Sequence, residues 1–360
     1  MLNLAVYASA HGYGHASRSH EVARALVEMR PGTRVIFCSA APPGFFTGET
    51  REGITYRSVS LDAGVRQRDS LSMDLPGTLD DLARLESQWE ALAQAEAGFL
   101  RREGIGLVLA DLPPLAFEAA ARAGVPVCGL ANFSWDWIYA GYAREYPAFR
   151  PHLRRIRRAY RHARILFRLP FAGRMDAFPR SEDVPLVARH SGLGREEARR
   201  RLGLPNGTPV ALFSFGGFGL DLRRAGTAAG DLILITTDPS PDPGLPFLHL
   251  TDARLAALQL RYPDLVAAAD AVVSKPGYGI VSECLANRTR LLYTPRGAFR
   301  EYPVLVRQMK LRLPAREVSL EALAGGAWRD DFRRLCDLPF PPPPDTRGAE
   351  AVARRLLEFA

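Results

Sequence analysis

Two histidines flank a glycine-rich segment close to the N-terminus. The segment HGYGH, residues 11–15, follows the apolar run Leu2–Ala8 and precedes a helical pattern that ends near Met29. The apolar run predicts a buried strand, and ligands of open parallel sheets bind beyond the carboxyl ends of such strands. A neutral imidazole can take a proton from an attacking hydroxyl group. His15 and His11 are therefore candidates for a general base.

A histidine base needs a group that orients its second ring nitrogen. Asp111 directly follows Leu107–Ala110, another short buried strand. Because the carboxyl ends of parallel strands meet at one edge of a sheet, we expect Asp111 to lie beside the histidines. The alternative is that the histidines only hydrogen-bond the backbone of their loop.

The histidine loop also has part of the spacing of a dinucleotide-binding fingerprint. Gly12-x-Gly14-x-x-Ser17 places serine where that fingerprint has its third glycine. The next strand also ends at Cys38 without an acidic residue to bind a ribose. The sequence therefore does not favour a nicotinamide cofactor.

A second glycine-rich segment predicts a site for a diphosphate. Residues 274–283, SKPGYGIVSE, join an apolar strand to a helix, where backbone amides and the helix N-terminus favour an anion. Lys275 would offset phosphate charge, and Glu283 would accept hydrogen bonds from ribose hydroxyl groups. The alternative is a tight turn with a capping glutamate. The residues assigned to the nucleotide are Lys275, Gly277, Tyr278, Gly279, Ser282 and Glu283.

Two further segments are expected at the same donor site. Gly216 and Gly217 follow the strand Pro209–Ser214, which belongs to the same half of the chain. Their loop is therefore expected at the same edge of the sheet. Glu301 follows a later strand, where it could bind sugar hydroxyl groups or cap the next helix.

An aromatic segment is the candidate acceptor site. NFSWDW, residues 132–137, follows the predicted strand Val125–Leu130 and reaches the same edge of the first sheet. Its aromatic rings could stack on a sugar face, and its polar groups could bind hydroxyl groups. The alternative is an aromatic helix start buried at an interface. The candidate acceptor residues are Asn132, Ser134, Trp135 and Asp136.

Both halves of the chain alternate strand-like and helix-like segments. This rhythm predicts an α/β fold with two Rossmann-like domains, whose parallel sheets face a central cleft. We place an N-terminal acceptor domain at residues 1–172 and a nucleotide-sugar domain at residues 173–340. Residues 341–360 form a proline-rich spacer and a C-terminal helix, which could return to the first domain.

Three segments together resemble a known superfamily: HGYGHASR at 11–18, NFSWD at 132–136, and the glycine-rich segment at 275–283. They resemble GT-B glycosyltransferases, and more closely the glycosyltransferase-like N-terminal half of plant L-arabinokinases and its free-standing bacterial relatives. The resemblance implies a donor nucleotide in the second domain, an acceptor in the first, and reaction in the cleft between them. It also implies that the histidine after the glycine, His15, is the base, whereas His11 is additional to the pattern.

We therefore expect a glycosyltransferase that moves a hexosyl or related group from a nucleotide-diphosphate-sugar to a hydroxyl acceptor. The donor is guessed to be a UDP-sugar, and the acceptor is a small molecule, a lipid or a glycan. The sequence contains no D-x-D motif, which fits an inverting reaction without a metal or another cofactor. The alternatives are a nucleotide-sugar hydrolase, a 2-epimerase and a non-catalytic nucleotide-sugar-binding protein.

Composition limits the remaining partners. The net charge of +8 comes almost entirely from arginine, because Lys275 and Lys310 are the only lysines. This bias is typical of genome composition, so we expect no nucleic-acid partner. The arginine-rich stretch Pro151–Arg168 is interpreted as a solvated amphipathic helix, with peripheral membrane contact as the alternative. The chain begins without a basic, cleavable leader, so we expect a cytoplasmic protein.

Overall fold

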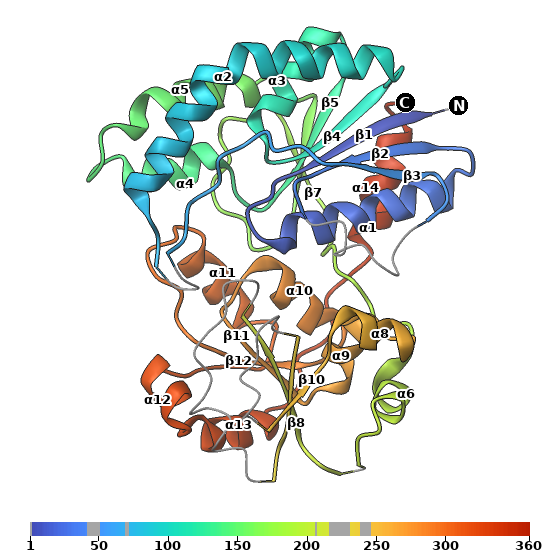
Figure 1. Cartoon of the computed structure of the whole chain (residues 1–360), viewed down its shortest axis with the longest axis vertical. Helices are drawn as coiled ribbons and strands as arrows, with labels where there is room; N and C mark the ends of the chain where they lie inside the picture. The colour runs from blue at the N-terminus through green and yellow to red at the C-terminus, as the bar shows by residue number, and fades with distance from the viewer. Residues whose placement is uncertain (1, 42–50, 69–71, 206, 216–230, 238–245) are drawn as a thin grey trace.

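The computed structural model describes residues 2–41, 51–68, 72–205, 207–215, 231–237 and 246–360. Two parallel β-sheets lie one above the other along the long axis of the molecule, each with helices on both faces (Figure 1). This arrangement confirms the predicted α/β fold with two Rossmann-like domains.

The first sheet has seven strands in the order β3-β2-β1-β4-β5-β6-β7. Its order reverses between β1 and β4, so the loops that follow these two strands diverge and leave room for a ligand. The strands are β1 (Asn3–Ala8), β2 (Arg34–Cys38), β3 (Ile54–Arg57), β4 (Leu107–Asp111), β5 (Val127–Ala131), β6 (Ile165–Arg168) and β7 (Ser181–Asp183).

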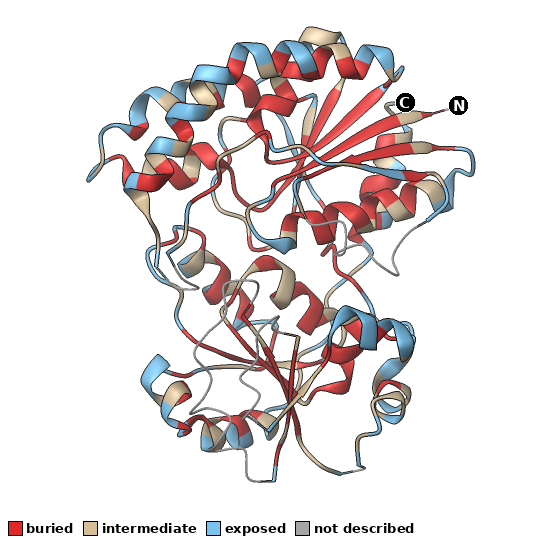
Figure 2. Ribbon diagram, in the orientation of Figure 1, coloured by how far each residue is buried: buried red, intermediate tan, exposed pale blue. Residues whose placement is uncertain are grey.

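Helices cover both faces of the first sheet because its strands are apolar on both sides. In β1, Leu4 and Val6 belong to the core beneath α1 and α14, whereas Ala5 and Tyr7 belong to the core beneath α2 and α3. Buried residues accordingly fill the strands and the inward faces of these helices (Figure 2). The helices are α1 (Tyr13–Met29), α2 (Leu75–Arg102), α3 (Pro114–Ala123), α4 (Trp135–Tyr142) and α5 (Phe149–Tyr160).

Among the described residues the second sheet has six strands in the order β10-β9-β8-β11-β12-β13, which reverses between β8 and β11. Its strands are β8 (Val210–Ser214), β9 (Ile233–Thr236), β10 (Phe247–His249), β11 (Ala271–Ser274), β12 (Arg290–Tyr293) and β13 (Ala315–Glu317). The helices after residue 190 are α6 (Gly194–Arg201), α8 (Asp252–Ala257), α9 (Tyr262–Ala268), α10 (Tyr278–Ala286), α11 (Tyr302–Met309), α12 (Leu320–Gly325), α13 (Trp328–Cys336) and α14 (Gly348–Leu357).

The arginine-rich stretch 151–168 is not one helix, and this part of the prediction was wrong. Helix α5 ends at Tyr160, and Ile165–Arg168 forms strand β6, which pairs with β5. The apolar run Ile165-Leu166-Phe167 is buried on the sheet, which outweighs the helical periodicity of the preceding arginines. Strand β7 then joins the same sheet, so the first sheet extends past the predicted division at residue 172.

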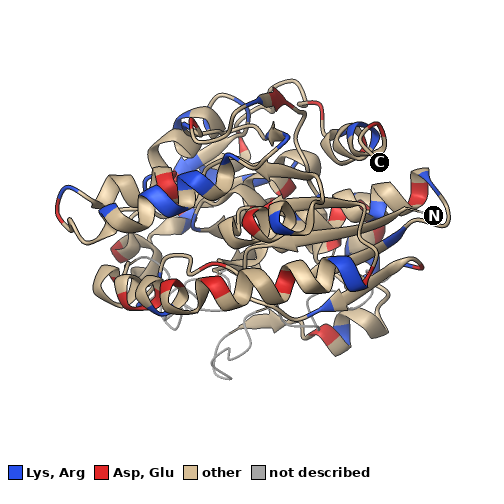
Figure 3. Cartoon of the chain, turned by 90° about the horizontal axis from the view of Figure 1, so that it is seen from above, with Lys and Arg blue, Asp and Glu red and all other residues tan. Residues whose placement is uncertain are grey.

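Charges of both signs are interspersed on the helices that cover the first sheet (Figure 3). Arg155 of α5 lies 3.0 Å from Glu86 of α2, and Arg157 lies 2.9 Å from Asp136. Part of the arginine charge is therefore neutralised by neighbouring carboxylates, which fits a solvated helix face. Membrane contact stays a prediction. None of the helices in the described ranges is long and apolar enough to cross a bilayer.

The last helix packs against the first. After the extended proline-rich spacer, α14 lies on α1, and its residues Val352 and Leu356 join the core that contains Leu4 of β1. The N–H of Gly348 donates a hydrogen bond of 3.1 Å to the carbonyl oxygen of Leu186, at the start of the second half of the chain. The chain therefore returns to the first domain at Gly348, and its two ends lie close together at the outer edge of that domain (Figure 1).

This docking depends on a glycine. A β-carbon at position 348 would lie 2.2 Å from the carbonyl oxygen of Pro185. We expect Gly348→Ala to lower the free energy of unfolding by about 1–3 kcal/mol because the backbone must shift. Gly325→Ala is the matched control, since a β-carbon there meets no atom within 4 Å. Thermal and urea unfolding would measure both variants, and equal stability would contradict this account of α14.

Candidate active site

A buried carboxylate lies where the order of the first sheet reverses. Asp111 is the last residue of β4, it pairs in register with Ala8 at the end of β1, and its side chain is fully buried. The backbone N–H of Ser9 donates a hydrogen bond of 3.1 Å to the carbonyl oxygen of Asp111, which holds the two strand ends together. The loop after β1 therefore begins directly beside this carboxylate.

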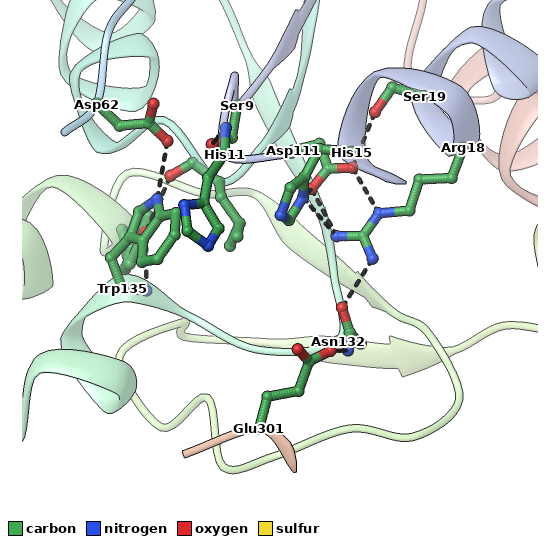
Figure 4. A network of polar contacts seen from close by, with 12 residues as sticks. Ser9, His11, His15, Arg18, Ser19, Asp62, Asp111, Asn132, Trp135 and Glu301 are labelled. Carbon is green, nitrogen blue, oxygen red and sulfur yellow. Dashed lines mark hydrogen bonds and ion pairs between the residues drawn. The ribbon is translucent and has the colours of Figure 1, made fainter. Parts of the chain in front are cut away.

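Three side chains of α1 contact the Asp111 carboxylate (Figure 4). His15 Nδ1 lies 2.9 Å from Oδ1, Arg18 Nε donates to Oδ2 at 2.6 Å, and Ser19 Oγ donates to Oδ2 at 2.9 Å. Arg18 Nη2 also donates to Oδ1 at 2.7 Å. Residues three and four positions apart share one face of a helix, so α1 presents this set together.

These contacts fix the charge of Asp111. Burial alone would raise the pKa of the carboxyl, but the charge of Arg18 and the contact with His15 lower it from the ordinary 3.8 to about 2. Asp111 is thus an anion at neutral pH. His15 Nδ1 also lies 3.0 Å from Arg18 Nη2, but that nitrogen already donates to Asp111 Oδ1 at 2.7 Å. We therefore assign the proton of His15 to Nδ1, because two unprotonated acceptors 2.9 Å apart would repel each other. His15 Nε2 then has a lone pair that can accept a proton.

His11 lies in a different setting. The backbone N–H of Val65 donates to its Nδ1 at 3.3 Å, which leaves its proton on Nε2. The ring stacks on Phe299 at 5.7 Å and meets the edge of Trp135 at 5.2 Å. Burial, followed by the charge of Arg296, lowers the pKa of His11 well below its usual value. His11 is therefore a neutral hydrogen-bond donor at Nε2, whereas His15 has the free acceptor that a base needs.

A chain of buried polar groups leads from Asp111 to the second domain (Figure 4). Arg18 Nη1 donates to Asn132 Oδ1 at 2.7 Å, and Asn132 Nδ2 donates to Glu301 Oε1 at 2.5 Å. Glu301 precedes α11, but its side chain makes no capping bond. Its carboxylate therefore faces the first domain, and the predicted capping alternative is not observed.

The two glycine-rich segments meet directly. A β-carbon placed on Gly279 would lie 3.1 Å from the α-carbon of Gly14, so a side chain there would need the two backbones to move apart by a few tenths of an ångström. Tyr278 begins α10 and is buried at the junction, where its ring lies 4.7 Å from the guanidinium carbon of Arg18. The hydroxyl of Tyr278 accepts a hydrogen bond of 3.2 Å from the N–H of Val187. The predicted acceptor-side and donor-side segments therefore lie against each other at the junction between the domains.

The other donor-site residues differ in their surroundings. Glu283 is buried and forms an ion pair with Arg189, whose Nε lies 2.7 Å from Glu283 Oε1. Ser282 donates to the carbonyl oxygen of Gly279 at 2.8 Å, within its own helix. Lys275 is partly buried between β11 and α10. Gly216 and Gly217 lie outside the described residues.

Most of the predicted acceptor residues are buried and contact other protein groups. Ser134 donates to Asp136 at 2.6 Å, and Trp135 Nε1 donates to Asp62 at 2.8 Å. This environment is typical of the predicted alternative, an aromatic helix start at an interface. A direct contact of these side chains with an acceptor stays a prediction.

Sequence reasoning missed Arg18, Asp62, Arg189 and Arg296. The position of Arg18, three residues after His15, was a usable signal, because that spacing puts both on one helical face. Asp62 and Arg296 lie in irregular segments, and no local pattern marks them.

Comparison with known proteins supports this architecture. No protein-family model matches the chain. It is 33% identical over 376 residues to L-arabinokinase of Arabidopsis thaliana, an alignment that covers all of this chain and 34% of the plant protein.

Solved structures resemble the whole chain. The glycotransferase of kitacinnamycin has a TM-score of 0.61 at 18% identity, over 99% of this chain and 93% of that chain. The spinosyn forosaminyltransferase SpnP has a TM-score of 0.60 at 13% identity, over 100% of this chain and 99% of that chain. A UDP-glucosyltransferase of Polygonum tinctorium has a TM-score of 0.60 at 14% identity, over 99% and 93%. The chain has the GT-B fold. The expected GT-B fold and the expected likeness to L-arabinokinase are confirmed.

The buried pair of Asp111 and Arg18 leads to a prediction about the stability of this GT-B chain. Asp111→Asn should lower the free energy of unfolding by about 3–5 kcal/mol at neutral pH, because it leaves the buried guanidinium of Arg18 without a counter-charge. The pKa of Asp111 is depressed in the folded state, so its contribution is complete above pH 3.8 and is lost toward pH 2. The difference between wild type and variant should therefore narrow over that interval.

Urea unfolding at several pH values would measure this difference. Asp81→Asn is the control, because Asp81 pairs with the exposed Arg66 and Arg84, and such pairs contribute less than about 1 kcal/mol. A difference for Asp111→Asn that stays constant from neutral pH to pH 2 would contradict the assigned charge.

Proposed function

We propose that this GT-B chain transfers a sugar from a nucleotide-diphosphate-sugar to a hydroxyl acceptor. The observation that carries the proposal is the His15–Asp111 pair, which lies at the edge of the first sheet beside the contact between Gly14 and Gly279. A base on one side and a phosphate-binding helix start on the other are the two groups that such a transfer requires. Three structurally similar proteins are named as sugar transferases, which supports the same reaction class.

The reaction begins at His15. Its Nε2 accepts the proton of the acceptor hydroxyl group, and the oxygen attacks the anomeric carbon of the sugar. The bond between that carbon and the diphosphate oxygen breaks as the new bond forms, which inverts the anomeric configuration. Asp111 stabilises the resulting imidazolium through Nδ1, as the carboxylate does in other acid–histidine pairs.

The leaving diphosphate is bound at the start of α10. Gly277 is the N-cap residue of this helix, and the first backbone N–H groups of the helix have no partner within the helix itself. These groups and the charge of Lys275 stabilise the diphosphate without a metal or another cofactor. We assign Gly277, Gly279 and Ser282 to this subsite.

The sugar and ribose contacts require the cleft to open. Glu283 and Glu301 are both buried, and each contacts another side chain, Arg189 and Asn132 respectively. A donor reaches these carboxylates only if the domains separate and then close around it, which also excludes water from the reaction. We propose that Glu283 binds the ribose and Glu301 the sugar. The donor is a UDP-sugar, the acceptor is a small molecule, lipid or glycan, and the reaction takes place in the cytoplasm.

His15→Ala tests this mechanism. We expect kcat to fall by about 10²–10⁴-fold, the usual contribution of a positioned general base. His162→Ala should leave kcat unchanged, because His162 is exposed in the turn after α5. The measurement is release of nucleoside diphosphate from a panel of nucleotide sugars, with and without hydroxyl acceptors.

The acceptor dependence distinguishes the alternatives. Hydrolysis or epimerisation of the nucleotide sugar at full rate without any acceptor would contradict the transferase proposal. The protein would then be a nucleotide-sugar hydrolase or a 2-epimerase. Equal rates for wild type and His15→Ala would contradict the assigned base.

A further inference from the structure

Two buried N–H groups in the cleft have no hydrogen-bond partner among the described residues. They are Nε2 of His11 and Nε of Arg296. Folded proteins pair nearly all of their buried donors, because an unpaired donor loses its hydration without compensation. Two such donors at the junction of the domains point to an acceptor that no described residue supplies.

Both donors lie against one ring at the junction of the domains. The His11 ring stacks on Phe299 with centroids 5.7 Å apart, and the guanidinium carbon of Arg296 lies 4.3 Å from the same centroid. His11 comes from the first domain, whereas Phe299 and Arg296 come from the loop after β12 in the second. Each domain therefore contributes one of these donors to the surroundings of the Phe299 ring.

The surroundings of these donors are positively charged. The Arg296 side chain is only 10% exposed, and the carboxylate of Glu301 is 4.0 Å away, beyond hydrogen-bond distance. That carboxylate also accepts the hydrogen bond from Asn132. Arg296 and Lys275 both act on His11, and their charge adds to burial in keeping its imidazole neutral. An oxyanion would satisfy both donors and offset this charge.

We propose that Arg296 and His11 form an oxyanion subsite that binds a carboxylate on the transferred sugar. A guanidinium N–H and a neutral imidazole N–H suit a carboxylate, because charge-assisted hydrogen bonds to it are strong. A sugar with only hydroxyl groups would leave the charge of Arg296 balanced, among the described residues, only by the 4.0 Å pair with Glu301. The inference rests on the proposed function and deepens it, since it names the donor as the nucleotide sugar of a uronic acid. Because the diphosphate is assigned to the start of α10, this subsite would bind the second negative group of the donor, the carboxylate of the sugar.

Calorimetric titration with four probes tests the proposal: UDP, UDP-glucose, UDP-glucuronic acid, and sodium glucuronate without a nucleotide. Wild type should bind UDP-glucuronic acid about tenfold to 100-fold more tightly than UDP-glucose, the range for a hydrogen bond to a charged group. Arg296→Gln should abolish this preference while the affinity for UDP is retained. Arg300→Gln is the matched control, because it removes the same charge from the same loop but from an exposed side chain. It should keep the preference.

Each result separates this inference from the proposed function. Equal affinity of wild type for both UDP-sugars, or a preference that survives Arg296→Gln, would overturn the carboxylate subsite. An equal loss of affinity for UDP and for both sugars in Arg296→Gln would assign the arginine to the nucleotide phosphate and would also overturn it. Binding of glucuronate that depends on Arg296, together with no binding of UDP, would support the subsite and contradict a UDP-sugar donor. No binding of any probe would overturn both the subsite and the UDP-sugar donor. Retained unfolding temperature in Arg296→Gln would show that the variant is folded.

Discussion

The buried carboxylate of Asp111 is the interaction on which the cleft depends. An unpaired charge at the end of a central strand would be strongly unfavourable, and three side chains of α1 compensate it together. These contacts fix the rotation and position of α1 relative to the sheet. They also determine which ring nitrogen of His15 faces the strand end and which one remains available for chemistry.

The same constraint reaches the second domain through Arg18. Its guanidinium contacts Asp111, Asn132 and the ring of Tyr278, so one side chain links the His15–Asp111 pair to the second domain. Asn132 passes the connection to Glu301. Opening of the domains must therefore break the bond between Asn132 and Glu301, whereas the bonds inside the first domain persist. The series of hydrogen bonds from Asp111 through Arg18 and Asn132 to Glu301 is therefore complete only when the two domains are in contact.

The sequence was sufficient to predict the parts of the structure that follow from local pattern. The apolar runs at β1, β4 and β11 predicted parallel strands, and the rule that their carboxyl ends share an edge predicted the neighbourhood of His15 and Asp111. Gly14 and Gly279 were predicted as loop residues, but they lie in the first turns of α1 and α10, and the direct contact between them was not foreseen.

The rest depends on tertiary pairing that no local pattern encodes. Glu283 was expected at a ribose, yet its partner in the structure is Arg189, 94 residues away along the chain. Ser134 and Asp136 appeared polar and available in the sequence, but they lie in the interior and bond to each other. The prediction for the segment 151–168 was wrong because the helical spacing of its arginines says nothing about the strand that follows. That strand, β6, forms because it pairs with β5 and is buried on the sheet.

The central claim, that the cleft binds a nucleotide-diphosphate-sugar at the start of α10, is tested most directly by calorimetric titration of the wild-type chain with UDP, GDP, ADP and dTDP and with the corresponding monophosphates. The account predicts that at least one nucleoside diphosphate binds at one site per chain and more tightly than its monophosphate. Absence of binding for all four diphosphates, or equal affinity for diphosphate and monophosphate, would contradict it.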